Sequence, residues 1–485
     1  MNKIAFSFLA AAAILLFLAF PAVAQQSALA DKDEVASAIR LWQATVESQM
    51  AYRGQPGISV GIVYDQELIW SHGFGFRDIK NKIPATPQTT YPIASITKLF
   101  TATAVLQLRD AGKLQLDDPV VKYLPWFKVR NEDEDGPVIS IRHLLTHTSG
   151  LPSESDFPYW TDARFPTREQ MIEMLPKQEA ADAPETRWKY SNLAVALAGE
   201  VVAAVSGEPY EAYVQKHILT PLGMTSTSFP DSPTQDPQLA AGYGRRMPDG
   251  SRAAEPFVNT KALTPAAGLS SNVDDLSRFV MLQFRDGKAG GKQILKGSTL
   301  KEMHRLQWLE PDWENGQGLG FAIWRVGNKT IVGHGGILFG YHTNISFSPE
   351  DKIGVIVLTN SYDGDPFSYA QQFYELVAPE IAKAAAPPTK ASPVDPAWNN
   401  YVGLYRASYG DSQVLILNGR LVVFDPQAQN IKGSLLTLTP TGPNTFKISG
   451  TDGEAEVGET LVFELAPDGK VTRMKVGANY RYPVR

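Results

Sequence analysis

The sequence predicts an α/β protein of the α+β kind, in which an antiparallel sheet flanked by helices carries an all-helical lobe and is followed by a small antiparallel β domain. Short strand patterns occur over 58–73 and return over 320–359. The region between them, from 96 to about 310, has helical periodicity and little strand alternation. Both ends of the first domain are therefore expected to build one sheet, with the helical region packed beside it as an insertion.

The first 24 residues are predicted to be a secretory signal peptide. Lys3 precedes an apolar stretch over 4–20, and the small residues of 21–24 resemble a cleavage site before Gln25. An uncleaved anchor is the alternative, although an apolar run of about 17 residues is at the short limit for crossing a bilayer. We expect a periplasmic or secreted protein with no stable membrane anchor after cleavage.

Composition and charge exclude several classes of protein. The 485 residues are 43% hydrophobic and 20% charged, which is ordinary for a globular chain of two or three domains. No cysteine is present, so disulfides, thiol catalysis and lipid attachment through cysteine are excluded. The formal net charge is -6 and no basic cluster indicates a nucleic-acid partner. We interpret the acidic run of 132–135 as a solvated loop rather than a cation site.

The helices and strands of the first domain are predicted from periodicity. An amphipathic helix is expected over 33–51, where apolar residues recur at spacings of three and four. Alternation and turn residues predict six short strands, at 58–64, 68–73, 320–326, 330–333, 341–347 and 353–359. A turn at 350–352 joins the last two strands, and a helix is expected at about 366–384.

The segment 91–98 contains the strongest candidate for catalytic chemistry. Because Pro92 does not fit inside a helix, a helix is predicted to begin at about Ser95. Residues 99–108 carry no charge, which indicates a helix buried on most of its faces. Lys98 lies on the same face as Ser95, one turn later, and burial lowers the pKa of an amine. Lys98 is therefore a candidate base for the serine hydroxyl, which is a poor nucleophile by itself.

Two histidines, His143 and His147, suggest a metal site because they are four residues apart. The glutamate that a zinc protease places beside its first histidine is absent, and no third ligand is apparent nearby. We therefore interpret both histidines as structural. The glycine-rich stretches 316–320 and 333–336 are poor dinucleotide fingerprints. No metal or organic cofactor is expected.

Two further segments change the interpretation of the Ser-x-x-Lys pattern, which is weak alone. Residues 188–192 read Trp-Lys-Tyr-Ser-Asn and open an apolar helix that is expected to stop near Gly207. Residues 331–336 read Ile-Val-Gly-His-Gly-Gly, a strand that ends in small residues and so allows close approach of a substrate. Taken singly, a tyrosine or a strand histidine in such a place usually serves packing.

Together, Ser-x-x-Lys at 95–98, Tyr-x-Asn at 190–192 and His-Gly-Gly at 334–336 resemble the three motifs of the serine β-lactamase and penicillin-binding superfamily. The resemblance is to the branch of class C β-lactamases and their esterase and D-amino-acid-peptidase relatives. Residues 112–119 and 143–151 are also similar to connecting segments of that family. The resemblance covers roughly residues 35–380 and implies a β-lactamase/transpeptidase-like fold.

The resemblance also implies a role for each residue of the motifs. Ser95 would attack a carbonyl and become acylated, and Lys98 and Tyr190 would move its proton to the leaving group and later help to activate water. Asn192 would orient the substrate. The backbone N–H groups of Ser95 and Ile337 would form the oxyanion hole, where preorganised donors stabilise the developing negative charge.

The third motif departs from the β-lactamase pattern. His334, Gly335 and Gly336 would contact the substrate where β-lactamases and cell-wall carboxypeptidases carry Lys-Thr-Gly. A neutral imidazole offers at best one donor to a substrate carboxylate, so penicillin-type substrates are disfavoured. The predicted function is a serine hydrolase that forms an acyl-enzyme with a small-molecule or peptide substrate, as esterases and peptidases do. A β-lactamase or D-Ala-D-Ala carboxypeptidase is one alternative, and a non-catalytic binding protein that retains the fold is another.

The domain boundaries follow from composition. Residues 25–381 form the predicted hydrolase domain, and the Pro- and Ala-rich stretch 382–395 is a predicted linker. Residues 396–485 are predicted to be a separate antiparallel β domain, with hairpin turns at Asn418-Gly419 and Asp468-Gly469. Nothing in this domain indicates catalysis. It is a candidate for shading the active site, for binding cell-wall material or for stability, and no oligomeric state is predicted.

Overall fold

The chain divides into two compact units, residues 1–386 and 387–485, and each is described by itself. The computed structural model describes residues 27–130, 136–285, 291–386, 395–428, 430, 433–450 and 455–484. The predicted signal peptide, the acidic run 132–135 and residues 387–394 of the predicted linker lie outside the described residues. Residues 382–385 of that predicted linker are helical, because the last helix of the first unit continues to Ala385.

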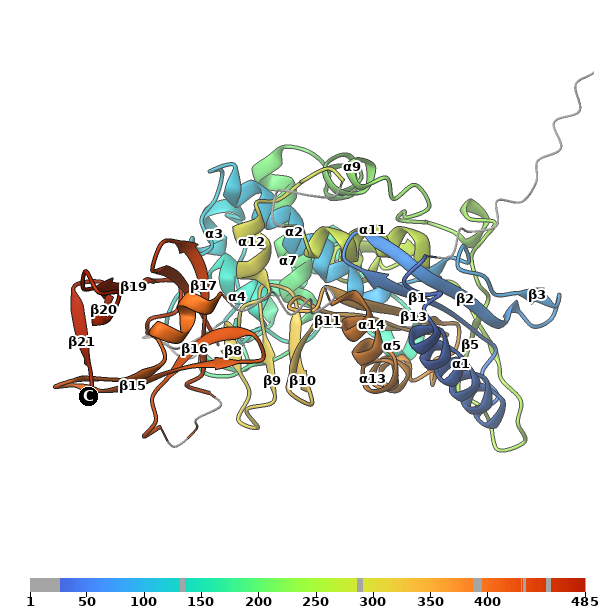
Figure 1. Cartoon of the computed structure of the whole chain (residues 1–485). Helices are drawn as coiled ribbons and strands as arrows, with labels where there is room; N and C mark the ends of the chain where they lie inside the picture. Colours follow the sequence, from blue (N-terminus) through green and yellow to red (C-terminus); the bar gives the residue numbers. More distant parts are fainter. Residues whose placement is uncertain are drawn as a thin grey trace, which may run out of the picture. The chain divides into compact units, whose positions relative to one another are not determined.

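The first unit is built on a nine-stranded antiparallel sheet with the order β3-β2-β1-β13-β12-β11-β10-β9-β8 (Figure 1). Pairing of β1 with β13, in the register Ile58↔Thr359, joins the two ends of the unit. Its strands are β1 (Gly57–Tyr64), β2 (Glu67–Asp78), β3 (Ile83–Pro84), β8 (Trp308–Leu309), β9 (Asn315–Gln317), β10 (Ala322–Val326), β11 (Lys329–Leu338), β12 (Tyr341–Ser348) and β13 (Ile353–Thr359). The predicted sheet is therefore confirmed, although β11 extends beyond the predicted 330–333 and the short strands β3, β8 and β9 were not predicted.

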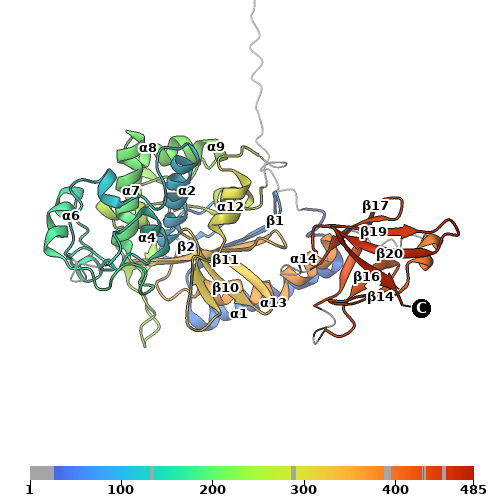
Figure 2. The ribbon, with the colours of Figure 1, turned by 90° about the vertical axis from the view of Figure 1, so that its left-hand side faces the viewer.

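The central strand β13 is buried along its whole length, because layers of helix cover both faces of the sheet. Its side chains alternate between two cores: Val355 and Val357 face one, and Ile356 and Leu358 face the other. Figure 2 shows the sheet between a layer that contains α1, α13 and α14 and the larger helical lobe. This sandwich is the arrangement that the sequence predicts.

Helices from the two ends of the unit form the first layer. They are α1 (Asp33–Arg53), α13 (Pro366–Leu376) and α14 (Ala378–Ala385). Trp42 of α1 packs edge-on against Phe373 of α13, with ring centroids 5.5 Å apart. A single helix was predicted at about 366–384, but Pro379 in the first turn of α14 interrupts it, because proline has no backbone N–H to continue the helical bonds.

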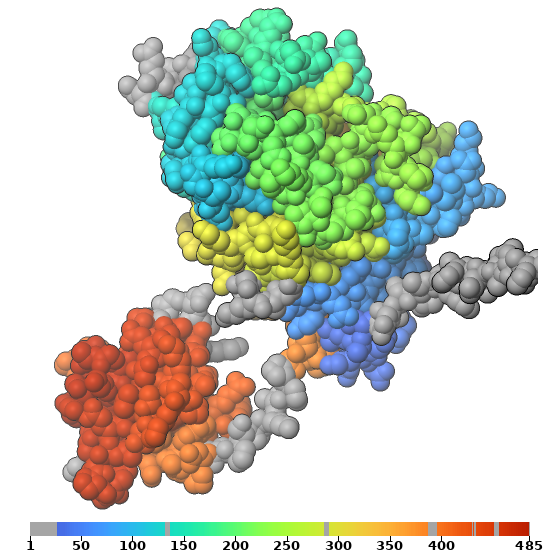
Figure 3. All heavy atoms as spheres, turned by 90° about the horizontal axis from the view of Figure 1, so that it is seen from above, coloured from blue at the N-terminus to red at the C-terminus, as the bar shows by residue number. Residues whose placement is uncertain are grey.

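The helical lobe covers the other face, and its segments form one packed mass in the space-filling view (Figure 3). Its helices are α2 (Thr97–Asp110), α3 (Val120–Tyr123), α4 (Ile141–Thr146), α5 (Tyr159–Asp162), α6 (Arg168–Met174), α7 (Asn192–Ser206), α8 (Tyr210–Val214), α9 (Thr220–Leu222), α10 (Thr264–Ala267), α11 (Val273–Gln283) and α12 (Gly297–Met303). Two small two-stranded sheets complete it, β4 (Tyr91–Pro92) with β7 (Ser270–Ser271) and β5 (Gly242–Tyr243) with β6 (Ala254–Glu255).

Helix α2 lies at the centre of this lobe and is buried on nearly every face. It packs against α7, which is more apolar than α2. Among the described residues, no single helix is long and apolar enough to cross a membrane. One bent pair, 192–206 with 210–222, passes that test by length and composition alone.

The second unit is a closed barrel of eight antiparallel strands. They are β14 (Gly403–Ala407), β15 (Gly410–Leu417), β16 (Arg420–Phe424), β17 (Leu436–Gly442), β18 (Thr445–Ser449), β19 (Thr460–Leu465), β20 (Val471–Val476) and β21 (Asn479–Pro483). Asn418 and Gly419 both have positive φ, as a two-residue hairpin turn requires. The core of the barrel contains the stacked rings of Tyr401 and Phe463, whose centroids are 4.4 Å apart. The prediction of an antiparallel β domain is confirmed, and closure into a barrel leaves it without edge strands.

We predict that a chain ending at Ala386 folds cooperatively, because the first unit contains its complete sheet and its own hydrophobic cores. Thermal unfolding followed by circular dichroism, compared with the full chain, tests this expectation. A chain ending at Leu376 is the control, because it loses Val377 and Ile381, both fully buried, and should be strongly destabilised. Failure of the longer fragment to fold would show that the barrel belongs to the same folding unit.

Candidate active site

Ser95 lies in a single 3₁₀ turn, Ala94–Ile96, directly before α2. The α-helix itself begins at Thr97, two residues later than predicted. Ala94 has φ 47°, a left-handed conformation that is costly for a residue with a side chain. Such strain persists only where the surroundings fix the backbone. The serine is thus held in a defined position at the entrance of a buried helix.

The Ser95 hydroxyl accepts two hydrogen bonds from the other two predicted catalytic residues. Lys98 Nζ donates at 2.9 Å, and the Tyr190 hydroxyl donates at 2.9 Å. Lys98 Nζ also donates to Asn192 Oδ1 at 2.6 Å and to the backbone carbonyl of Ala266 at 2.9 Å. Three segments far apart in the sequence therefore meet at one amine, and only the Ala266 contact had no signal in the sequence, because a backbone carbonyl is common to every residue.

Burial decides the protonation states of Lys98 and Tyr190. Removal of water from Lys98 lowers its pKa to about 7, and the nearby Glu154 opposes this shift. Burial raises the pKa of Tyr190 well above its usual value, so its phenol stays protonated and remains a donor to Ser95. Near neutral pH a large fraction of Lys98 is therefore the free amine, which can accept the serine proton.

His147 positions the segment that carries Tyr190 and Asn192. The Ser191 backbone N–H donates to His147 Nδ1 at 3.2 Å, and the Lys189 backbone N–H donates to the His147 carbonyl at 2.8 Å. The imidazole lies 4.5 Å from the Tyr190 ring. Burial lowers the pKa of His147 well below its ordinary value, so the ring stays neutral.

The structure places His143 and His147 in different environments rather than at one metal site. Helix α4 ends at Thr146, and His147 adopts the left-handed conformation that terminates it. His143 Nε2 lies 3.0 Å from Glu185 Oε1, and its Nδ1 accepts from the Ser140 backbone N–H. The part of the chain that the structure describes holds no group of three histidine or acidic side chains arranged to bind a metal ion.

Strand β11 brings the third motif against the nucleophile. A Cβ atom on Gly336 would lie 2.2 Å from the Ile93 carbonyl oxygen, so only glycine allows the strand to approach this closely. A Cβ atom on Gly335 would lie 2.5 Å from the ring of Phe367, a side chain of α13. Gly335 therefore leaves room for an aromatic ring, and Gly336 sets the distance between β11 and Ser95.

His334 differs from its predicted role as a hydrogen-bond donor to substrate. Its Nδ1 lies 2.5 Å from the Gly335 carbonyl, an acceptor, so the proton of the neutral ring is assigned to Nδ1. Burial and the Lys98 charge lower the pKa of His334 to about 4. Nε2 is then an unprotonated acceptor, which repels a carboxylate rather than binding it.

A cavity of about 450 Å³ opens over Ser95. Its lining includes Ser95, Tyr190, Asn192, His334, Gly335, Gly336 and Ile337, together with Trp160, Trp188, Gln317, Ala322, His342, Tyr362 and Phe367. The structure thus gathers every predicted site residue except the fully buried Lys98 on one cavity wall. The aromatic residues were not predicted, apart from Trp188, which was noted only as the start of a motif.

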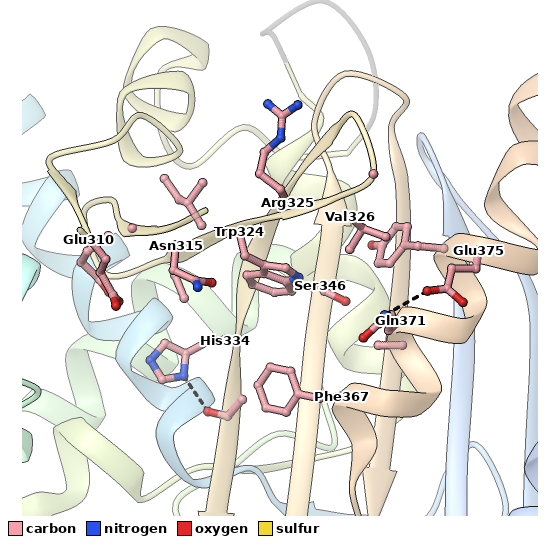
Figure 4. A pocket seen from close by; sticks show the side chains of 18 of the residues that line it. Glu310, Asn315, Trp324, Arg325, Val326, His334, Ser346, Phe367, Gln371 and Glu375 are labelled. Carbon is pink, nitrogen blue, oxygen red and sulfur yellow. Dashed lines mark hydrogen bonds between the residues drawn. The ribbon is translucent and has the colours of Figure 1, made fainter. Parts of the chain in front are cut away.

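A second groove of about 570 Å³ adjoins this cavity (Figure 4). The two share Trp188, Gln317, Ala322, His334, Gly335 and Phe367. In Figure 4, His334 and Glu310 lie on one side of the groove, and Gln371 and Glu375 of α13 lie on the other. The catalytic cavity therefore continues over strands β9 and β10, toward the edge of the sheet that β8 forms, where a longer substrate has room.

Sequence reasoning missed Glu154, which reaches the site through a hydrogen bond from Asn192. Its Oε1 accepts from Asn192 Nδ2 at 2.6 Å and from Trp160 Nε1 at 3.2 Å. The first of these bonds turns the Asn192 amide so that its oxygen faces Lys98. Glu154 follows the predicted segment 143–151 by three residues, in a loop without periodicity, so no pattern in the sequence indicated its contact with Asn192.

The Ser95 hydroxyl, hydrogen-bonded to a buried lysine and to a tyrosine, has the arrangement of a Ser-Lys-Tyr site. Residues 42–378 match the family profile described as Beta-lactamase. The chain therefore belongs to the beta-lactamase family, whose members are serine hydrolases that act on small-molecule or peptide substrates.

Two curated proteins are similar to this chain in sequence, each with less than 30% identity. Protein flp of Staphylococcus aureus is 27% identical over 309 residues, covering 63% of this chain and 59% of that protein. The putative penicillin-binding protein PbpX of Bacillus subtilis is 29% identical over 300 residues, covering 62% of this chain and 69% of that protein. This chain thus spans about three fifths of the length of flp.

Solved structures share the fold. The octameric penicillin-binding protein homologue from Pyrococcus abyssi has a TM-score of 0.63 at 28% identity and covers 91% of this chain and 99% of that one. EstCE1, a hydrolase with promiscuous acyltransferase activity, has a TM-score of 0.59 at 23% identity and covers 73% of this chain and 99% of its own. The similarity to EstCE1 shows a shared fold only.

We predict that the rate of Ser95 acylation rises with pH through an apparent pKa of about 7, because only the free amine of Lys98 accepts the serine proton. Below that pH the rate should fall about tenfold per unit, and above it the rate should level off. The rate at which a fluorophosphonate labels Ser95, measured from pH 5 to pH 9, tests this pH dependence. Lys98→Arg, whose guanidinium keeps its proton, should be nearly inactive at every pH. A flat profile would remove Lys98 as the base.

We also predict that Gly336→Ala is more damaging than Gly335→Ala. The first change pushes β11 away from the fixed Ile93 carbonyl, at a cost of about 1 to 3 kcal/mol in stability, and moves it away from Ser95. The second meets only the half-exposed Phe367 ring, which can rotate. Unfolding midpoints and labelling rates of both variants test the order, and Phe367→Ala should relieve Gly335→Ala but not Gly336→Ala.

Proposed function

We propose that the protein is an exported serine hydrolase that cleaves an ester, amide or peptide bond through an acyl-enzyme on Ser95. One observation carries this proposal: the Ser95 hydroxyl accepts hydrogen bonds from Lys98 and Tyr190 at the wall of a single cavity. Export is proposed from residues 1–24, which have the pattern of a signal peptide.

The proposed reaction begins when the free amine of Lys98 takes the proton of Ser95. The serine oxygen then forms a bond to the substrate carbonyl carbon. Backbone N–H groups of Ser95 and Ile337, both on the cavity wall, are the proposed donors to the oxyanion. When the bond to the leaving group breaks, Tyr190 gives its hydroxyl proton to that group and regains one from Lys98. Water then attacks the acyl carbon in the reverse sense and releases Ser95.

The cavity favours substrates without a carboxylate beside the reacting bond. It presents the acceptor Nε2 of His334 where β-lactamases carry a lysine, and burial lowers the pKa of His342 to about 4, so that ring is neutral too. A β-lactamase or D-Ala-D-Ala carboxypeptidase is therefore the less favoured alternative. The acyl part that fits best is apolar, because Trp160, Trp188 and Phe367 line the cavity.

The proposal predicts that a fluorophosphonate labels the protein once, at Ser95, and that Ser95→Ala abolishes both labelling and turnover. Loss of the nucleophile should cost on the order of 10⁶ in rate. Peptide mapping locates the label, and p-nitrophenyl esters and a chromogenic cephalosporin compare the substrate classes. Faster turnover of the cephalosporin than of the esters would favour the β-lactamase alternative. Absence of labelling in the unaltered protein would indicate a binding protein that retains the fold.

A further inference from the structure

The groove beside the catalytic cavity contains two buried hydroxyl groups without hydrogen-bond partners. Ser346 of β12 and Tyr374 of α13 both line it. Both residues are buried, and neither hydroxyl forms a hydrogen bond with any residue that the structure describes. Ser346 lies near enough to oppose the rise that burial causes in the pKa of Tyr374, but the two hydroxyls do not reach hydrogen-bond geometry. Buried polar groups nearly always have a partner, so these hydroxyls indicate that a ligand enters the groove.

The walls of this groove are largely apolar, and several of them are aromatic. Phe367, Ala370 and Tyr374 line it from one face of α13, at helical spacings of three and four. Trp324 of β10 lines it from the sheet, and its ring centroid lies 6.3 Å from that of Phe367. In Figure 4, Trp324, Ser346 and Phe367 lie together between the strands and α13. Such walls suit a flat apolar ring, and a polar group on the ring would meet the two hydroxyls.

The charges around the groove disfavour an acidic ligand. Among the described residues, two carboxylates, of Glu310 and Glu375, and one guanidinium, of Arg325, line it. His334 lines it too and is neutral, because burial lowers its pKa to about 4. Two carboxylates against one guanidinium leave an excess of one negative charge, so an uncharged ring is favoured. A hydroxyl group is the polar group that suits the site best, since Ser346 and Tyr374 can each donate and accept.

The groove is continuous with the catalytic cavity. Gly335 and Phe367 line both, and Gly335 has no side chain to separate them. The groove has a volume of about 570 Å³, which lies within the range of about 300 to 1,000 Å³ that is usual for small-molecule sites. A substrate whose reacting carbonyl lies at Ser95 therefore has room to extend past Gly335 into the groove.

We propose that this groove binds an uncharged aromatic ring that carries a hydroxyl group, at the end of the substrate distant from the bond that Ser95 attacks. Ser346 and Tyr374 form hydrogen bonds with the ring hydroxyl, and Trp324 and Phe367 pack against the ring. This inference rests on the proposed function, because it assigns the groove to a substrate of Ser95.

The test removes both hydroxyls in a double variant, Ser346→Ala with Tyr374→Phe. Because neither hydroxyl has a partner in the described protein to lose, the unfolding midpoint of this variant should not fall. Ser361→Ala is the matched control. The Ser361 hydroxyl is also buried without a partner among the described residues, but Ser361 does not line the groove. The full chain is used throughout.

The first measurement is binding, which does not depend on turnover. 4-Hydroxyphenylacetamide and phenylacetamide are uncharged and differ only in the ring hydroxyl, and titrations followed by NMR signals of the ligand give the Kd of each. The unaltered protein and Ser361→Ala should bind the hydroxylated amide about 3- to 10-fold more tightly, and the double variant should lose this preference. Equal affinities in the unaltered protein, or a preference that the double variant keeps, would overturn the inference.

The second measurement is hydrolysis of esters that hold a phenyl ring at increasing distance from the reacting bond. p-Nitrophenyl esters from 3-phenylpropanoate to 6-phenylhexanoate place the ring on the acyl side, and acetate esters of the corresponding phenylalkanols place it on the leaving side. Each ester is compared with its 4-hydroxyphenyl counterpart. In at least one series, at the chain length that reaches the groove, kcat/KM should favour the hydroxylated ester about 3- to 10-fold in the unaltered protein and in Ser361→Ala, but not in the double variant.

The two measurements separate failure of this inference from failure of the proposed function. A binding preference without a preference in either ester series would show a ring site that the substrate does not use, and would overturn the inference while the serine hydrolase stands. Failure of a fluorophosphonate to label Ser95 would overturn the proposed function itself, and with it the assignment of the groove to a substrate.

Discussion

The whole site depends on the exclusion of water from the Lys98 amine. An ammonium is stable inside a protein only when acceptors replace its hydration, and here the acceptors come from the 3₁₀ turn, from α7 and from the carbonyl of Ala266 in α10. Each element is held in turn by the apolar packing of α2 against α7. The hydrophobic core of the lobe thus sets the basicity of one amine, and a change in that packing alters chemistry as well as stability.

The sheet and the helices beside it could be predicted because their signals are local and periodic. β1, β12 and β13 are runs of seven or eight mostly buried residues bounded by turn residues, and α1 repeats apolar residues at helical spacing over 21 residues. β8 and β9 have two and three residues, too few for a pattern, and exist only because β10 offers its edge. Pro379 marks the break between α13 and α14, but apolar residues continue on both sides of it and favour a single helix in the sequence.

The candidate site was predictable where chemistry and spacing coincide, as for Ser95 and Lys98, and not where function depends on the direction of a side chain. The sequence names His334 but does not say which ring nitrogen carries the proton. The Gly335 carbonyl decides that, and it turns a presumed donor into an acceptor. Glu154 acquires its meaning only through Asn192, 38 residues further along the chain. Such long-range contacts leave no periodic trace in a sequence.

The pairing of β1 with β13 has a consequence for how the chain folds. Ile58 and Thr359, about 300 residues apart, are neighbours in the sheet, so the first hairpin keeps one edge unpaired until almost the entire unit is available. Contacts within the helical lobe are largely more local than the pairing of β1 with β13. They form sooner, because closing a long loop costs entropy before its ends can bond. The sheet that supports His334 and its two glycines is therefore completed late. The catalytic site, with Ser95 in the turn before α2, is complete only once β11 has joined this sheet.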